Sequence, residues 1–151
     1  MILLPNHPEQ LSGSDVILKK INYFELNSKQ KEIYNFSKIS SILADYGFNC
    51  IKLTDDWGGV DFLAYHKDGQ SLKVQLKARL TISKKYLGKE LFIAFPNQED
   101  WYMVEHDLLV KILKSNSNYL NSKSWKKDKG EYSSAKPSRK LLLEIARFKI
   151  V

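Results

Sequence analysis

The sequence has few of the residues that form disulfides or zinc sites. Cys50 is the one cysteine in 151 residues, which excludes an internal disulfide and suits a reducing cytosol. The three histidines, at positions 7, 66 and 106, match neither zinc-ligand nor HNH-type spacing. We therefore expect a cytoplasmic protein without a structural zinc site.

Long apolar runs are lacking as well. The start, from Met1 to Pro5, is far too short for the apolar region of a signal peptide, and no stretch is long enough to span a membrane. A membrane partner is therefore not expected. No internal repeat is visible, and a length of 151 residues suits a single domain. We expect four parts in that domain: an N-terminal arm over 1–27, a core over 28–110, a basic loop over 115–138 and a C-terminal helix over 139–151.

The charge of the chain is unbalanced toward the basic side. The net charge is +7 with a pI of about 9.4, which suits a polyanionic partner. Nine lysines and arginines stand against three acids between Lys123 and Lys149, which accounts for most of the excess. Tyr119, Trp125 and Tyr132 are interleaved with these charges, and they either stack on a nucleic acid or fold back on the core.

A hairpin over residues 58–79 organises the rest of the chain. Val60, Phe62 and Ala64 alternate with polar positions, and Leu72, Val74 and Leu76 do the same after a turn at 66–70. A type I turn followed by Gly69 in the left-handed conformation would place Phe62 opposite Val74. A tighter turn at Asp68-Gly69 would slip the register by one residue and bury Asp61. The apolar pattern favours the bulged turn.

This register gathers three polar side chains, Asp61, Gln75 and Lys77, on one face of the hairpin. Asp61 would hold a divalent cation, Gln75 would offer a neutral oxygen ligand, and Lys77 would orient or polarise the attacking water. The alternative is a polar face that simply meets water. Leu63 and Tyr65 on the same face favour a covered one, in which a charge needs a partner.

The strings Gly58-Gly59-Val60-Asp61 and Val74-Gln75-Leu76-Lys77 resemble the core of the PD-(D/E)XK nuclease superfamily, in its Asp…Gln-x-Lys form. The resemblance implies a restriction-endonuclease-like α/β fold, with a central mixed sheet and helices on both sides. The first helix, 28–46, would cover one side and the C-terminal helices the other. The expected strands cover residues 48–53, 60–66, 71–79, 91–95 and 101–105.

The same resemblance implies the chemistry of the site. It assigns Asp61, Gln75 and the carbonyl of Leu76 to an Mg²⁺ or Mn²⁺ ion, with Lys77 catalytic. Glu32, which falls on the apolar stripe of the first helix, is either a further acid of that site or a first-turn acid favoured by the helix dipole. The expected function is endonucleolytic cleavage of DNA by a homodimer, although RNA would suit the same basic residues. Arg79, Lys84, Lys85, Lys89, Lys126, Lys127 and Lys129 are the candidate nucleic-acid contacts.

Two other functions remain open from the sequence. The chain could be a nuclease-like DNA-binding module whose metal site has decayed through Gln75, or a regulatory adaptor that binds an acidic protein. Asp55 and Asp56 fit either the metal site or a loop, and His106 fits a structural role. Asn27 or Ser28 is expected to cap the first helix, Asp107 the helix over 108–113, and Ser138 the last one.

Overall fold

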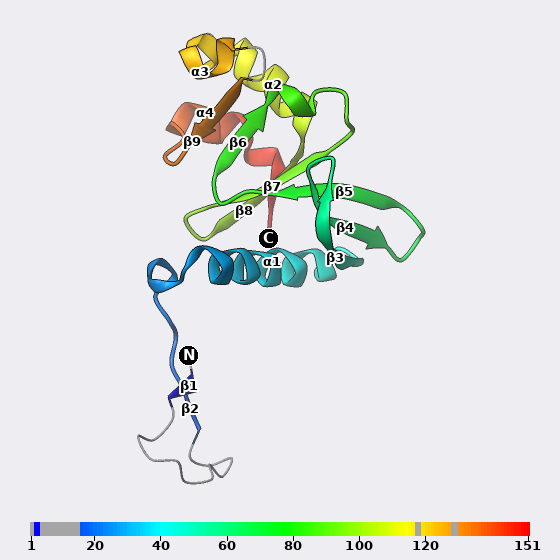
Figure 1. The fold of residues 1–151 in the computed structure, drawn as a ribbon, viewed down its shortest axis with the longest axis vertical. Helices are drawn as coiled ribbons and strands as arrows, with labels where there is room; N and C mark the ends of the chain where they lie inside the picture. Colours follow the sequence, from blue (N-terminus) through cyan, green and yellow to red (C-terminus); the bar gives the residue numbers. More distant parts are fainter. Residues whose placement is uncertain (1, 4–15, 117–118, 128–129) are drawn as a thin grey trace. The chain divides into compact units, whose positions relative to one another are not determined.

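The computed structural model describes residues 2–3, 16–116, 119–127 and 130–151 (Figure 1). The chain forms two compact units, Met1–Tyr34 and Asn35–Val151. The first contains an antiparallel pair of short strands, β1 (Ile2–Leu3) and β2 (Ile17–Leu18). A short 3₁₀ turn over Tyr23–Glu25 follows them.

The long helix α1 (Ser28–Asp45) begins at a reciprocal cap. The side-chain oxygen of Asn27 accepts a hydrogen bond from the backbone N–H of Gln30 at 2.9 Å, and the Gln30 side chain accepts one from the N–H of Asn27 at 3.0 Å. This capping box satisfies two of the backbone donors that a helix start leaves open. Of the two predicted caps, Asn27 is therefore the one that acts.

The second unit is built on a mixed six-stranded sheet. The strand order is β10-β8-β7-β5-β4-β3, and β5 with β7 is the one parallel pair in that sheet as described. The strands are β3 (Phe48–Trp57), β4 (Val60–His66), β5 (Ser71–Leu76), β7 (Phe92–Asn97), β8 (Asp100–Glu105) and β10 (Lys149–Ile150). The predicted mixed α/β sheet is confirmed. The predicted C-terminal helix over 139–151 is wrong at its end, because the helix stops at Glu144 and Lys149–Ile150 pairs with β8 as β10.

Two strands of the second unit differ from the sequence prediction. The expected strand 71–79 ends at Leu76, and a separate strand, β6 (Leu80–Ser83), follows it and pairs with β9 (Glu131–Ser134). The predicted long loop over 115–138 is wrong, because part of this segment pairs with β6 as a strand. It contains β9, the short helix α3 (Lys123–Lys126) and a 3₁₀ turn, Tyr119–Asn121.

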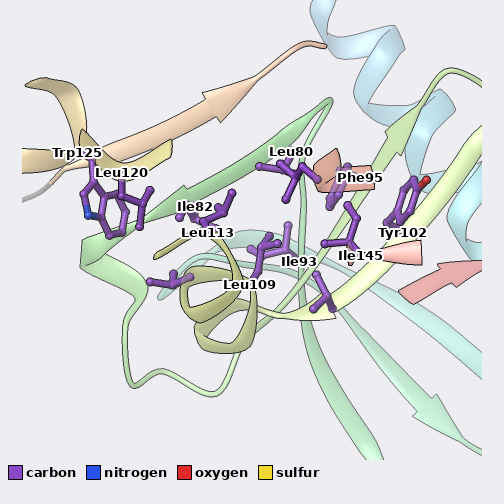
Figure 2. Close-up of a cluster of buried hydrophobic side chains, with 13 residues drawn as sticks. Leu80, Ile82, Ile93, Phe95, Tyr102, Leu109, Leu113, Leu120, Trp125 and Ile145 are labelled. Carbon is purple, nitrogen blue, oxygen red and sulfur yellow. The ribbon is translucent and has the colours of Figure 1, made fainter. Parts of the chain in front are cut away.

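Helices cover both faces of the sheet, as predicted. On one face, Ile39 and Leu43 of α1 pack against apolar side chains of the sheet: Phe62, Ala64, Val74, Ala94 and Trp101. On the other face, α2 (His106–Ser115) and α4 (Arg139–Glu144) join β6 over β7 and β8. Figure 2 shows this second cluster, with Trp125 and Leu120 at one end and Tyr102 at the other. No helix among the described residues is long and apolar enough to cross a membrane.

Of the caps predicted for α2 and α4, one is confirmed and one is wrong. Ser138 caps α4 as predicted, since its hydroxyl accepts a hydrogen bond from the backbone N–H of Leu141 at 3.2 Å. The prediction that Asp107 caps α2 is wrong, because Glu105 takes the N-cap position. The Asp107 carboxylate is instead held by the backbone N–H of Gly88 at 3.0 Å.

Gly130 joins α3 to β9 at a point with no room for a side chain. A Cβ there would lie 1.9 Å from the carbonyl oxygen of Trp125, which is a backbone atom and cannot rotate away. The Gly130 carbonyl also accepts a hydrogen bond from the backbone N–H of Lys84 at 2.8 Å. The close approach of the chain at Gly130 to the backbone of α3 therefore depends on glycine.

We predict that Gly130→Ala lowers the free energy of unfolding by about 3 kcal/mol, as expected for overpacking against backbone. Gly69→Ala is the control, because a Cβ there meets nothing within 4 Å and only its φ of +99° is unfavourable. That control should cost about 1 kcal/mol. Urea denaturation of the two variants measures both values. A Gly130→Ala protein as stable as wild type would contradict the packing.

Candidate active site

The hairpin of β4 and β5 has the register that the sequence predicts. Phe62 pairs with Val74, and the backbone N–H of His66 donates to the carbonyl of Gln70 at 2.7 Å. The N–H of Gly69 donates to the His66 carbonyl at 2.8 Å, and Gly69 has a φ of +99°. The type I turn with a left-handed glycine is therefore confirmed, and the one-residue slip is excluded.

Asp61 and Gln75 directly adjoin Phe62 and Val74 in the chain, and that pair is the last of β4 and β5. The backbone N–H of Leu76 donates to the Asp61 carboxylate at 2.7 Å, a length typical of a charge-assisted bond. A side-chain oxygen thus takes a strand donor at the point where the paired rungs of β4 and β5 end. The carboxylate is exposed to solvent but fixed in direction.

Gln75 is the buried member of the group, with 3% of its surface exposed. It lies beside the Gly58-Gly59 turn that joins β3 to β4. A Cβ on Gly59 would lie 3.0 Å from the Gln75 amide nitrogen and 2.4 Å from a ring carbon of Tyr86, and Gly59 has a φ of +88°. Glycine at this position therefore allows the turn to approach the amide closely.

Lys77 follows the last residue of β5. Its backbone N–H donates to the carbonyl of Ala94 in β7 at 2.9 Å, so the chain keeps its strand direction there. Strand alternation then puts Lys77 on the face of Gln75, where it is half-buried. The expectation of a covered face is right at Gln75 and wrong at Tyr65, which is 51% exposed. Cover over this face is partial.

Glu32 does not lie on a buried stripe, contrary to the prediction. Its side chain is 51% exposed and forms an ion pair with Lys29 at 3.7 Å, both in the first unit. The buried positions of α1 begin later, at Asn35. A role for Glu32 in the metal site stays a prediction.

The donor set on the hairpin consists of oxygen ligands. The Asp61 carboxylate, the Gln75 amide and the Leu76 carbonyl are groups that hard cations such as Mg²⁺ and Mn²⁺ accept. Asp55 and Asp56, for which either a metal or a loop role was open, both fall within β3, and Asp55 is exposed there. Among the described residues, no three His, Cys, Asp or Glu side chains form a metal cluster.

A buried histidine lies behind the site, and the sequence indicated only that it is structural. The backbone N–H of Ser83 donates to Nε2 of His106 at 3.2 Å, so that nitrogen carries the lone pair and Nδ1 carries the proton. Nδ1 lies 3.0 Å from the Asp107 carboxylate. Burial opposes ionisation of Asp107, but hydrogen bonds from His106 and Gly88 outweigh it and lower the pKa of the carboxyl below its ordinary value. These contacts support a structural role for His106.

The two basic segments predicted separately come together in the fold. Lys84 donates its ammonium to the carbonyl of Lys127 at 3.1 Å and lies over the ring of Trp125, 5.3 Å from its centroid. We call Lys84, Lys85, Lys126 and Lys127 the basic cluster. Arg79 is exposed in the connection between β5 and β6, and Lys89 is exposed in the connection that leads into β7. Lys129 lies outside the described residues.

The interleaved aromatic residues fold back on the core instead of facing a ligand. Trp125 is 5% exposed and belongs to the core cluster. Tyr119 and Tyr132 are half-buried against it, with their rings edge to face at 6.2 Å. Stacking by Trp125 is therefore excluded in this conformation, and Tyr119 and Tyr132 have part of their rings packed against the core.

Two solved structures share similarity of fold with this chain. One is a bacterial homing endonuclease, I-Ssp6803I, at 14% sequence identity and a TM-score of 0.45, covering 75% of this chain and 78% of its own. The other is Hjc, a Holliday junction resolvase from the archaeon Archaeoglobus fulgidus, at 11% identity and a TM-score of 0.40, covering 70% and 88%. No family model and no curated protein sequence matches the chain. Likenesses this distant carry no inference about activity.

We predict that Gln75→Glu destabilises the protein in EDTA as pH rises. Burial raises the pKa of a carboxyl above its value near 4.3 in the unfolded chain, so the folded state binds the extra proton more tightly. The contribution of the substituted side chain to stability is fully present below about pH 4.3, and it is lost as pH rises through the folded pKa of that side chain. The loss amounts to roughly 1.4 kcal/mol for each pH unit that separates the folded pKa from the unfolded one.

The matched control is Gln70→Glu, the same substitution at an exposed turn residue. Urea denaturation across this pH range compares the two variants with wild type. Identical pH profiles for Gln75→Glu and Gln70→Glu would contradict the burial of position 75.

Proposed function

We propose that this chain is a divalent-metal-dependent endonuclease that hydrolyses phosphodiester bonds in DNA. The observation that supports the proposal is the register of β4 and β5, in which Phe62 pairs with Val74 and the Leu76 N–H donates to the Asp61 carboxylate. Strand alternation from this register would set Asp61 opposite Gln75, with Lys77 on the same face. A fixed carboxylate and a neutral oxygen ligand could hold a divalent ion, and an ammonium group could orient the attacking water in metal-assisted phosphodiester hydrolysis.

Asp61, Gln75 and the carbonyl of Leu76 would hold Mg²⁺ or Mn²⁺. When bound, such an ion lowers the pKa of a water molecule and neutralises charge on the scissile phosphate. With Asp61 as the one acid among the three, the set compensates little of the charge of a divalent cation. The DNA phosphate then supplies further negative charge, which predicts that ion and substrate bind together.

The chain's own groups account for positioning and charge. The Leu76 N–H holds the Asp61 carboxylate in one direction, so little reorganisation is needed when the substrate binds. Lys77, held in strand geometry by the Ala94 carbonyl, presents its ammonium toward charge that develops on the phosphate and orients the attacking water.

DNA binding rests on the basic cluster, with Arg79, Lys89 and Lys129 as further candidate contacts. Because the nearby aromatic side chains are packed in the core, the contact is made with phosphates, and duplex DNA is the best-matched substrate. A duplex has two strands to cut, and a homodimer would supply one site to each.

One observation favours a second function, a DNA-binding module without cleavage. The described residues contain no cluster of three acidic, histidine or cysteine ligands, and Gln75 adds no charge to Asp61. Such a module would bind duplex DNA with the same salt dependence but leave it intact. The cleavage measurement below separates the two functions.

We predict that the wild-type protein nicks supercoiled plasmid DNA in Mg²⁺ or Mn²⁺, and that Asp61→Asn and Lys77→Ala each lower the rate by about 10² or more. Asn keeps an oxygen that accepts the Leu76 N–H, so the variant isolates charge from structure.

Two exposed residues of the hairpin turn supply matched controls, Asp68→Asn and Lys67→Ala, which should cut like wild type. Gel electrophoresis of the plasmid forms measures all rates. If Asp61→Asn and Lys77→Ala cut at the wild-type rate, the site lies elsewhere. A wild-type protein that binds DNA but never nicks it supports the binding module.

We predict that Lys126→Ala combined with Lys127→Ala weakens DNA binding and flattens its dependence on salt. Each lost phosphate contact lowers the slope of log K against log salt by about 0.9 on duplex DNA. Lys84 is left intact because it packs over Trp125.

The control for this pair is Lys67→Ala with Lys149→Ala, which removes equal charge from the hairpin turn and from β10. Fluorescence anisotropy at several salt concentrations measures the slopes. An equal loss of slope in both double variants would show that only net charge matters, and not the basic cluster.

A further inference from the structure

Tyr86, which the sequence did not single out, lies against the Gly59 turn beside Gln75. A ring carbon of Tyr86 and the amide nitrogen of Gln75 both lie within 3.0 Å of the point where a Gly59 Cβ would stand. The ring edge and the amide thus converge on the Gly58-Gly59 turn. The 3% exposure of Gln75 is consistent with a cover of this kind.

The segment that carries Tyr86 is fixed on both sides. Before it, the backbone N–H of Lys84 donates to the carbonyl of Gly130 at 2.8 Å. After it, the N–H of Gly88 donates to the Asp107 carboxylate at 3.0 Å, and the ammonium of Lys73 donates to the carbonyl of Lys89 at 3.1 Å. A short 3₁₀ turn, Lys84–Tyr86, between such anchors leaves Tyr86 little freedom.

Contacts of the buried His106 ring support this segment. The ring of His106 meets the ring of Tyr86 edge to face, with centroids 6.2 Å apart. His106 is itself held by the Ser83 N–H on one nitrogen and by Asp107 on the other. The same Asp107 carboxylate binds both His106 and Gly88, so one side chain fixes the ring behind Tyr86 and the backbone after it.

We propose that Tyr86 is a positioning residue of the active site. Its ring holds the Gln75 amide against the Gly58-Gly59 turn and thereby keeps the amide on the rung of Asp61. This inference rests on the proposed nuclease function for its catalytic consequence, but the contact itself is independent of activity. The Tyr86 atom nearest to the Gly59 turn is a ring carbon, so we assign the role to the ring rather than to the hydroxyl.

The first arm of the test measures burial and needs neither metal nor DNA. Gln75→Glu is placed in the wild-type, Tyr86→Phe and Tyr86→Ala backgrounds, and urea midpoints are compared across the acid pH range in EDTA. We expect Phe to keep the pH-dependent change in midpoint caused by Gln75→Glu and Ala to lose most of it, because Ala admits water to position 75. An unchanged pH dependence in Tyr86→Ala overturns the proposal.

The second arm measures plasmid nicking, with Tyr86→Leu added as a variant that keeps apolar volume if the alanine variant folds poorly. A misplaced ligand lowers turnover more than DNA affinity, so kcat should fall by about 10-fold to 10²-fold with KM little changed in Tyr86→Ala and Tyr86→Leu. Tyr86→Phe should match wild type. A Phe variant as slow as the Ala variant overturns the assignment to the ring.

The two arms separate the two proposals. If wild type does not nick DNA while Tyr86→Ala still uncovers position 75, the proposed function fails and the contact stands. If wild type nicks DNA and Tyr86→Ala does so with unchanged kcat, the positioning role fails and the proposed function stands.

Discussion

The geometry of the candidate site depends on one hydrogen bond, from the backbone N–H of Leu76 to the carboxylate of Asp61. It takes the place of a strand-to-strand bond at the rung where the pairing of β4 and β5 ends. On its other side, the chain after β5 continues along β7 through the bond from Lys77 to Ala94. The site is therefore set at a fork, where β5 follows one neighbour and separates from the other.

The fork also explains why an amide suits position 75. Gln75 is enclosed by the Gly59 turn and the Tyr86 ring, and an uncompensated carboxylate in such a place would carry a desolvation penalty whenever the ion was absent. The exposed position opposite it is the acid, Asp61, which avoids that penalty. In the proposed metal site, this arrangement would give lower metal affinity and higher stability of the metal-free protein than a second acid would.

The hairpin could be predicted from the sequence because its information is local. Alternation fixes the face of each side chain, and Asp68-Gly69 permits the bulged turn that fixes the register. The Tyr86 contact has no such signature, since Gly59, Gln75 and Tyr86 are brought together only by the fold. The strand β9 was missed because its Ser-rich sequence resembles a loop, and it forms through pairing with β6.

The most direct measurement is the anomalous difference map of crystals grown with Mn²⁺ and a duplex DNA oligonucleotide. We predict a Mn²⁺ peak bound by Asp61, with the Gln75 amide and a DNA phosphate among its other ligands. A map with ordered DNA but no peak at Asp61, or with its peak at other residues, would contradict the assignment of this hairpin as the catalytic centre.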